Sequence, residues 1–149
     1  DIGFNYRITD IQCALGRSQL QRLNDFVGKR RKIAAKYDSI FKSSEVANSP
    51  LVAKDIIHSY HLYPLQINFE TTKLSKSALF KTMESEGIGL QVHYIPIHWQ
   101  SYYQRHYHFD RHQFPNAVQF YNREVSLPIY PDLKESEQNK VIQALVKHL

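Results

Sequence analysis

The sequence predicts an α+β fold: a long connecting helix leads into a small C-terminal domain, in which helices cover a short, mainly antiparallel three-stranded sheet. Two observations support this prediction. Apolar residues recur at helical spacing from Ile8 to Phe41, which is far longer than an average helix. Short segments rich in aromatic and branched residues then alternate with further helical patterns. We expect residues 1–43 to form a loop and the interdomain helix, and residues 58–149 to form the small domain.

The long helix has a recognisable start. Thr9 and Gln12 have the spacing of a capping box, in which each side chain bonds an amide at the beginning of a helix. Gly28 lies inside the helical pattern and predicts a bend or a break. The basic run 29–32 is interpreted as a solvated helix face, with phosphate binding as the alternative. Cys13 is interpreted as a small, buried apolar residue of this helix.

The middle of the chain predicts one connection, one strand and one helix. Residues 43–57 are polar, contain a proline and predict a surface connection. Residues 60–69 predict a strand, which Pro64 places at a sheet edge or bulge. Ser75 is a candidate N-cap for the next helix, and Gly87 is a candidate C-terminal stop.

The last third predicts four more elements around an aromatic loop. Residues 91–95 predict a strand, and a loop dense in aromatics and histidines follows to about residue 112. Residues 114–122 predict a short helix with a proline in its first turn, and residues 125–129 a short strand. Residues 135–148 predict an amphipathic final helix.

Composition excludes several protein classes. The 149 residues are 42% hydrophobic and 22% charged, as expected for one globular unit or a piece of a larger protein. A single cysteine excludes an internal disulfide. Neither a membrane-spanning stretch nor a signal-peptide pattern is visible, so we expect a cytoplasmic protein with no membrane partner. The net charge of +5 permits an anionic partner, but no nucleic-acid-binding motif accompanies it, so we expect no nucleic-acid partner.

The histidines raise the question of a metal. His106, His108 and His112 have suggestive spacing, but the segment has no cysteine nearby and no regular element to aim three imidazoles at one point. We therefore expect no metal and interpret the segment as a surface loop or a loop that faces a ligand. His93 lies on a predicted strand, and its spacing favours a buried, hydrogen-bonded histidine over a binding residue.

Five motifs, in order along nearly the whole chain, resemble those of the DegT-type, pyridoxal-phosphate-dependent sugar aminotransferases of fold type I. They are GFNYRITDIQCALG at 3–16, HLY at 61–63, GIGLQVHYIPIH at 87–98, FPNA at 114–117 and SLPIYP at 126–131. The resemblance implies an enzyme that uses pyridoxal phosphate to move an amino group from glutamate to a 4-keto nucleotide-sugar, as a homodimer. It also implies that the lysine that binds the cofactor covalently lies upstream of Gly3. We therefore expect this chain to be the C-terminal third of the enzyme, inactive alone.

The resemblance also assigns roles to individual residues. Asn5 would bind the cofactor phosphate of the partner subunit, and Arg7 would lie near that phosphate or the sugar diphosphate, with a structural ion pair as its alternative. His93 and Tyr94 would contact the nucleotide-sugar, with His98 as a weaker candidate. The histidines at 106, 108 and 112 receive no role. Two other functions stay open: a stand-alone module that binds a nucleotide-sugar or another anion, and a nucleic-acid-binding domain.

Overall fold

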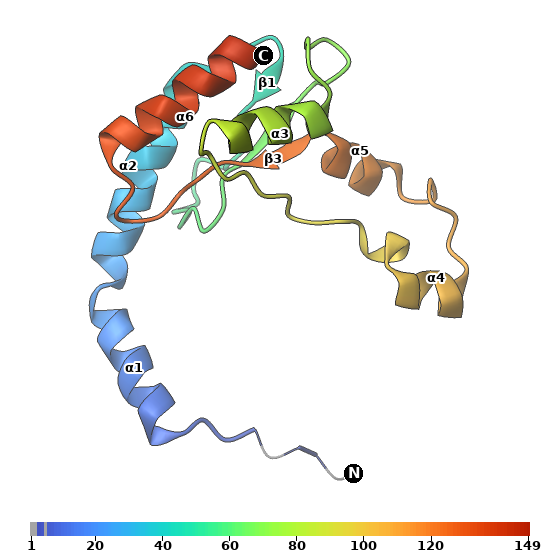
Figure 1. The fold of residues 1–149 in the computed structure, drawn as a ribbon. Coiled ribbons are helices and arrows are strands. Elements are labelled where there is room, and N and C mark those ends of the chain that lie inside the picture. Colours follow the sequence, from blue (N-terminus) through green and yellow to red (C-terminus); the bar gives the residue numbers. More distant parts are fainter. Residues whose placement is uncertain (1–2, 5) are drawn as a thin grey trace.

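The computed structural model describes residues 3–4 and 6–149 and confirms the α+β class. Figure 1 shows a small sheet with helices packed around it, from which the N-terminal helix and the segment that carries α4 extend in different directions. The elements are α1 Asp10–Gln21, α2 Leu23–Phe41, β1 Ala47–Asn48, β2 Pro64–Ile67, α3 Lys76–Ser85, a 3₁₀ turn Ile97–Trp99, α4 Ser101–Tyr107, α5 Pro115–Arg123, β3 Glu124–Ser126 and α6 Glu135–His148.

The sheet has three antiparallel strands in the order β1-β2-β3. Ala47 pairs with Ile67, and Leu65 pairs with Val125. The prediction that residues 43–57 form only a connection was wrong, because β1 lies within them. The strand predicted at 91–95 is reduced to one bridge, between Gln91 and Ser126.

The position predicted for Pro64 was also wrong. β2 is the central strand of the sheet, between β1 and β3. Pro64 is its first residue, where a missing N–H costs little because the pairing with Ser126 only begins there. A proline at the start of a strand therefore does not require that strand to lie at an edge.

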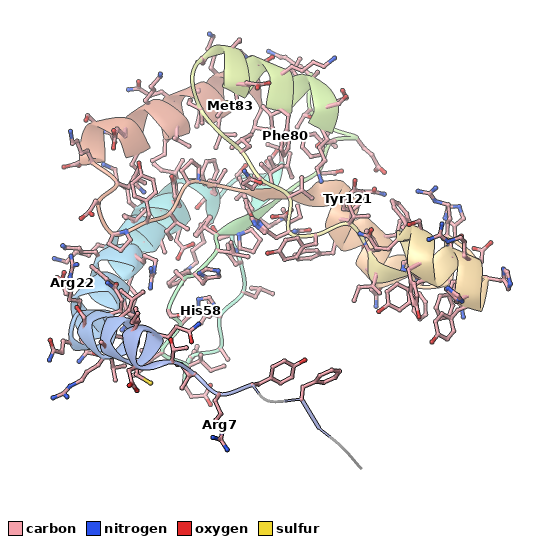
Figure 2. The ribbon with its side chains drawn as sticks, turned by 60° about the horizontal axis from the view of Figure 1, so that its bottom comes forward. Arg7, Arg22, His58, Phe80, Met83 and Tyr121 are labelled. Carbon is pink, nitrogen blue, oxygen red and sulfur yellow. The ribbon has the colours of Figure 1, made fainter. Side chains whose placement is uncertain are left out.

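The core lies between the sheet and three helices. Leu65 and Ile67 of β2 are fully buried and belong to one core cluster with residues of α2, α3 and α6. Figure 1 shows α6 lying along α2, and Gln138 on α6 donates a 2.8 Å hydrogen bond to the carbonyl of Ile33 on α2. On α3, Met83 is buried in the core and Phe80 packs against it (Figure 2). The core therefore packs α2 against the sheet.

The long helix is interrupted, but not where the glycine suggested. α1 ends and α2 begins around Arg22, whose N–H bonds the carbonyls of Gln19 and Leu20. Gly28 lies inside α2 with open space around it and causes no break. The guanidinium of Arg22 instead lies 4.6 Å from the ring centroid of Phe26, a cation–π contact one turn further along.

The local signals at helix ends are confirmed. Thr9 and Gln12 form the expected capping box at α1. Ser75 caps α3 by accepting from the N–H of Ala78 at 3.3 Å. Gly87 follows α3 with φ +73°, the left-handed conformation that a glycine adopts without strain.

α1 is exposed along its whole length. The structure describes all of its residues, and none of them is buried. Cys13 is therefore exposed, which corrects its interpretation as a buried residue. Ile11 and Leu15 are likewise exposed, so this helix presents apolar side chains that the rest of the chain does not cover. None of the helices in the described part of the chain is both long and apolar enough to cross a bilayer.

Candidate functional site

His93 and Tyr94 lie side by side just after the Gln91–Ser126 bridge. Their rings meet edge to face with centroids 4.6 Å apart. The Tyr94 side chain is 71% exposed, whereas His93 is half-buried. The exposed tyrosine and the half-buried histidine thus both reach the surface from neighbouring positions of the backbone.

His93 is anchored to β3 by two hydrogen bonds. Its backbone N–H donates to Glu124 Oε2 at 2.9 Å, and its ring Nδ1 lies 2.8 Å from Ser126 Oγ. The Ser126 hydroxyl in turn donates to Glu124 Oε1 at 2.5 Å. The bond to the Glu124 side chain takes the His93 N–H that a continuing strand would use, which explains why the predicted strand shrinks to one bridge.

Glu124 is fully buried, and its charge acts on that of Lys76. A glutamate is rarely buried so completely unless its carboxylate is paired with a cation or hydrogen-bonded. Lys76 opens α3, where a cation is disfavoured by the helix dipole. Burial lowers the pKa of Lys76, and the charge of Glu124 opposes that change. Glu124 therefore favours the charged form of Lys76.

Lys76 is also held by α5. Its Nζ donates a short hydrogen bond to the carbonyl of Tyr121 and lies 4.6 Å from the centroid of the Tyr121 ring. Figure 2 labels Tyr121 on the helix that leads into β3. These contacts join the first turn of α3 to the end of α5, directly before β3 begins at Glu124.

His98 is buried rather than open to solvent. Its Nε2 lies 3.1 Å from the carbonyl oxygen of Arg111, to which Trp99 Nε1 also donates at 2.9 Å. The His98 ring packs edge-on against Phe114, with centroids 4.9 Å apart. In this arrangement His98 ties the two ends of the aromatic loop together. Its role in substrate binding stays a prediction.

The histidines of the loop are not brought together. His106 lies on α4 with its ring 4.5 Å from that of Tyr102, and His108 ends α4 in the left-handed conformation. The backbone N–H of His112 donates to Asp110 Oδ1 at 2.7 Å. Within residues 3–4 and 6–149, no three His, Cys, Asp or Glu side chains are grouped closely enough to hold a metal ion.

Arg7 lies on the segment before α1, far along the chain from His93 and Tyr94. Its side chain is exposed and points away from the ribbon in Figure 2. Asn5 lies outside the described residues. The expected cofactor-binding pair and the expected substrate-binding pair are therefore on different parts of the molecule, and the roles of all of them stay predictions.

A small cavity of about 180 Å³ opens beside His93. His61, Gln91, Ser126 and Pro128 are among the residues that line it. The sequence motifs included His61 and Ser126 without giving either of them a role. The cavity joins three of the five family-like motifs at one place, because His61, His93 and Ser126 come from 61–63, 87–98 and 126–131.

The sequence did not reveal Glu124 or Lys76 as members of the site. A glutamate next to a predicted strand usually faces solvent, and a lysine in a first helical turn is ordinary. One signal was present: Glu124 and Ser126 are two residues apart, so a strand places both on the same face, opposite to Val125. Two polar residues on one strand face could have indicated a hydrogen-bonded partner.

Comparisons with known proteins identify relatives of this chain. SpsC, a spore coat polysaccharide biosynthesis protein of Bacillus subtilis, is 35% identical over 144 residues, which cover 96% of this chain and 37% of SpsC. Two solved structures are also similar. Helicobacter pylori PseC, an aminotransferase involved in pseudoaminic acid biosynthesis, superposes with a TM-score of 0.87 at 32% identity over 99% of this chain and 39% of its own.

The second solved structure is Spr1654 of Streptococcus pneumoniae, described as a sugar aminotransferase and determined in a PLP form. It has a TM-score of 0.84 at 27% identity, over 92% of this chain and 34% of its own. This chain thus spans under two fifths of the length of the relatives that it matches. A family model matches residues 1–146. The chain belongs to the DegT/DnrJ/EryC1/StrS aminotransferase family.

Proposed function

We propose that this chain is the C-terminal part of a pyridoxal-phosphate-dependent transaminase that moves an amino group from glutamate to a 4-keto nucleotide-sugar. The observation that carries the proposal is the His93–Tyr94 pair, which is held on β3 through Ser126 and Glu124 and leaves the Tyr94 hydroxyl exposed. An imidazole nitrogen and a phenol are suited to the hydroxyls, amides and carbonyl groups of a nucleotide-sugar. Membership in a family of sugar aminotransferases supports the same substrate class.

The residues described here fit one part of a cofactor site. Arg7 is an exposed guanidinium, whose N–H donors match phosphate oxygens, and Asn5 would add an amide from the same segment. When bound, pyridoxal phosphate supplies the electron sink for amino transfer. Lys76 donates to the carbonyl of Tyr121 and lies over the Tyr121 ring. We therefore propose that the covalent lysine lies outside this chain and that the chain alone is inactive.

We further propose that the enzyme is a homodimer in which Asn5 and Arg7 serve the active site of the partner subunit. The residues directly before α1, which include Arg7, extend away from the sheet, as Figure 1 shows. Phe4 and Tyr6 on this segment are 84% and 86% exposed, which is high for aromatic side chains and favours contact with another surface. A cytoplasmic location fits the supply of nucleotide-sugars and the single, exposed Cys13.

The finer proposal concerns the product. We propose the transaminase that forms UDP-4-amino-4,6-dideoxy-N-acetyl-β-L-altrosamine, because the motifs resemble those of that variety and the similarity to PseC supports it. The carbonyl carbon at C4 of the UDP-linked 4-keto sugar would then receive the amino nitrogen. His93 and Tyr94 would position the sugar by contacts at its other substituents.

The alternative is a stand-alone module that binds a nucleotide-sugar without catalysis. Adding pyridoxal phosphate to the 149-residue chain and to the protein with its preceding polypeptide separates the two functions. We expect a visible absorbance band only in the longer protein, and borohydride should abolish that band while fixing the cofactor on its lysine. A borohydride-fixed label on a lysine of these 149 residues would contradict the placement of the covalent lysine. Nucleotide-sugar binding by a protein that forms no such band at any length would favour the module.

A further inference from the structure

The contacts around Ser126 determine which nitrogen of His93 carries the proton. A serine hydroxyl has one hydrogen to donate, and a carboxylate can only accept. Ser126 lies 2.5 Å from Glu124 Oε1, so its hydrogen is committed to the carboxylate. Ser126 Oγ must then accept at its other contact, the one of 2.8 Å with His93 Nδ1. The proton of a neutral His93 therefore lies on Nδ1.

The orientation of Glu124 is fixed independently. Its Oε2 accepts from the backbone N–H of His93 at 2.9 Å, which leaves Oε1 for Ser126. Glu124 is fully buried, and both of its oxygens accept a hydrogen bond, one from the His93 N–H and one from the Ser126 hydroxyl, as a carboxylate requires. The same glutamate thus holds both the backbone and, through Ser126, the ring of His93.

We propose that Glu124 and Ser126 are positioning residues that keep the proton of His93 on Nδ1 and present Nε2 to the substrate as a hydrogen-bond acceptor. This inference rests on the proposed function for the identity of the ligand. Nε2 lies on the side of the imidazole away from Ser126, and the half-buried ring borders the small cavity. A hydrogen-bond acceptor recognises a donor, so His93 selects a hydroxyl or amide N–H of the nucleotide-sugar and does not bind an oxygen of its diphosphate.

A single substitution that keeps the size of the side chain should move the proton of His93 from Nδ1 to Nε2. In Glu124→Gln the His93 N–H still requires an oxygen, which turns the new NH₂ group toward Ser126. Ser126 then accepts from the amide and donates its own hydrogen to His93 Nδ1. The proton of His93 moves to Nε2, which becomes a donor. A purely structural role for Glu124 predicts lower stability but no such exchange.

The test is the ¹⁵N chemical shifts of the His93 ring, measured near neutral pH in the protein that carries this chain, with the signals assigned by His93→Gln. We expect a protonated Nδ1 and an unprotonated Nε2 in the natural sequence, and the reverse in Glu124→Gln. Glu84→Gln, the same change at an exposed position of α3, should leave the shifts unchanged. A protonated Nε2 in the natural sequence would overturn the proposal, whether or not Glu124→Gln folds.

A kinetic measurement tests the ligand separately. With a UDP-linked 4-keto sugar as substrate, Glu124→Gln should raise KM roughly tenfold and change kcat less, because a donor then faces a donor. If the ¹⁵N chemical shifts of His93 change as expected but KM does not, the positioning role of Glu124 and Ser126 is supported and the contact between His93 and the substrate is rejected. Absence of any transaminase activity would reject the proposed function and leave the ¹⁵N result as the test of the positioning residues.

Discussion

The hydroxyl of Tyr63 donates a 2.6 Å hydrogen bond to Asp38 Oδ1. Tyr63 precedes β2, and Asp38 lies near the end of α2, so this bond joins the helical region to the central strand. The same hydroxyl lies 3.0 Å from Ser49 Oγ, just after β1. The backbone of Tyr63 also accepts from the N–H of Leu127 at 3.0 Å. One buried tyrosine therefore connects four segments that are distant in sequence.

Tyr63→Phe tests this connection. The substitution keeps the ring and removes the oxygen, leaving Asp38 without its donor, so the free energy of unfolding should fall by about 1 to 2 kcal/mol. Urea unfolding followed by circular dichroism measures the change. Tyr102→Phe on α4 is the matched control, since that ring is 55% exposed and its loss of a hydroxyl should change little. Equal midpoints for the two variants would contradict the account.

Stability at alkaline pH should depend on two buried tyrosines. Burial raises the pKa of Tyr37 above its usual 10, and burial together with the bond to Asp38 raises that of Tyr63. Above about pH 10 the unfolded chain loses these phenolic protons while the folded chain keeps them, so the free energy of unfolding falls as pH rises. Lys76 has the opposite effect on the free energy of unfolding. Burial lowers its pKa, so just below pH 10.5, its usual pKa, the unfolded chain binds this proton more tightly and stability rises with pH.

The alkaline effect is measured as the urea midpoint between about pH 9 and pH 11. In Tyr37→Phe the slope should become less steep, because one of the tyrosines with a raised pKa no longer titrates. The same substitution removes the 2.9 Å hydrogen bond to the carbonyl of Pro128, which lowers the midpoint at every pH. Parallel curves for the natural chain and Tyr37→Phe would show that Tyr37 does not contribute to the slope.

The exposed apolar residues of α1 predict self-association of the 149-residue chain. Ile11 is 83% exposed and Leu15 62% exposed, one turn apart on the same helix face. Covering these side chains removes apolar area from water, which favours association. Sedimentation velocity over a range of concentrations should show dimers or larger species. The double variant Ile11→Gln with Leu15→Gln should shift the chain toward monomer.

Arg17→Gln, a polar change on the same helix, is the control for that experiment. It should leave the association unchanged, because it alters charge without altering the apolar face. A chain that stays monomeric at all concentrations would contradict the prediction. An equal effect of the control and the double variant would show that the face formed by Ile11 and Leu15 is not the contact.

Local signals in the sequence predicted local structure. The capping box at Thr9, the cap at Ser75 and the left-handed glycine at Gly87 depend on a few neighbouring residues and were all confirmed. The proline in the first turn of α5 was confirmed for the same reason. Such signals need no knowledge of the remainder of the fold.

The features that could not be predicted from the sequence depend on tertiary contacts. The loss of the 91–95 strand follows from Glu124, which takes the N–H of His93 from more than thirty residues away. β2 becomes the central strand because β1 pairs with it, although β1 has only two residues and no strand pattern of its own. The burial of His98 likewise depends on Arg111 and Phe114, which close the loop over it.

The central claim is amino transfer to a nucleotide-sugar by the protein that carries this chain. The most direct measurement is incubation of that protein with pyridoxal phosphate, ¹⁵N-labelled glutamate and a UDP-linked 4-keto sugar, followed by mass spectrometry. The account predicts a nucleotide-sugar that has gained one ¹⁵N amino group, with less product from His93→Ala than from the natural protein. Recovery of the keto sugar without ¹⁵N, from a protein that binds both substrates, would contradict it.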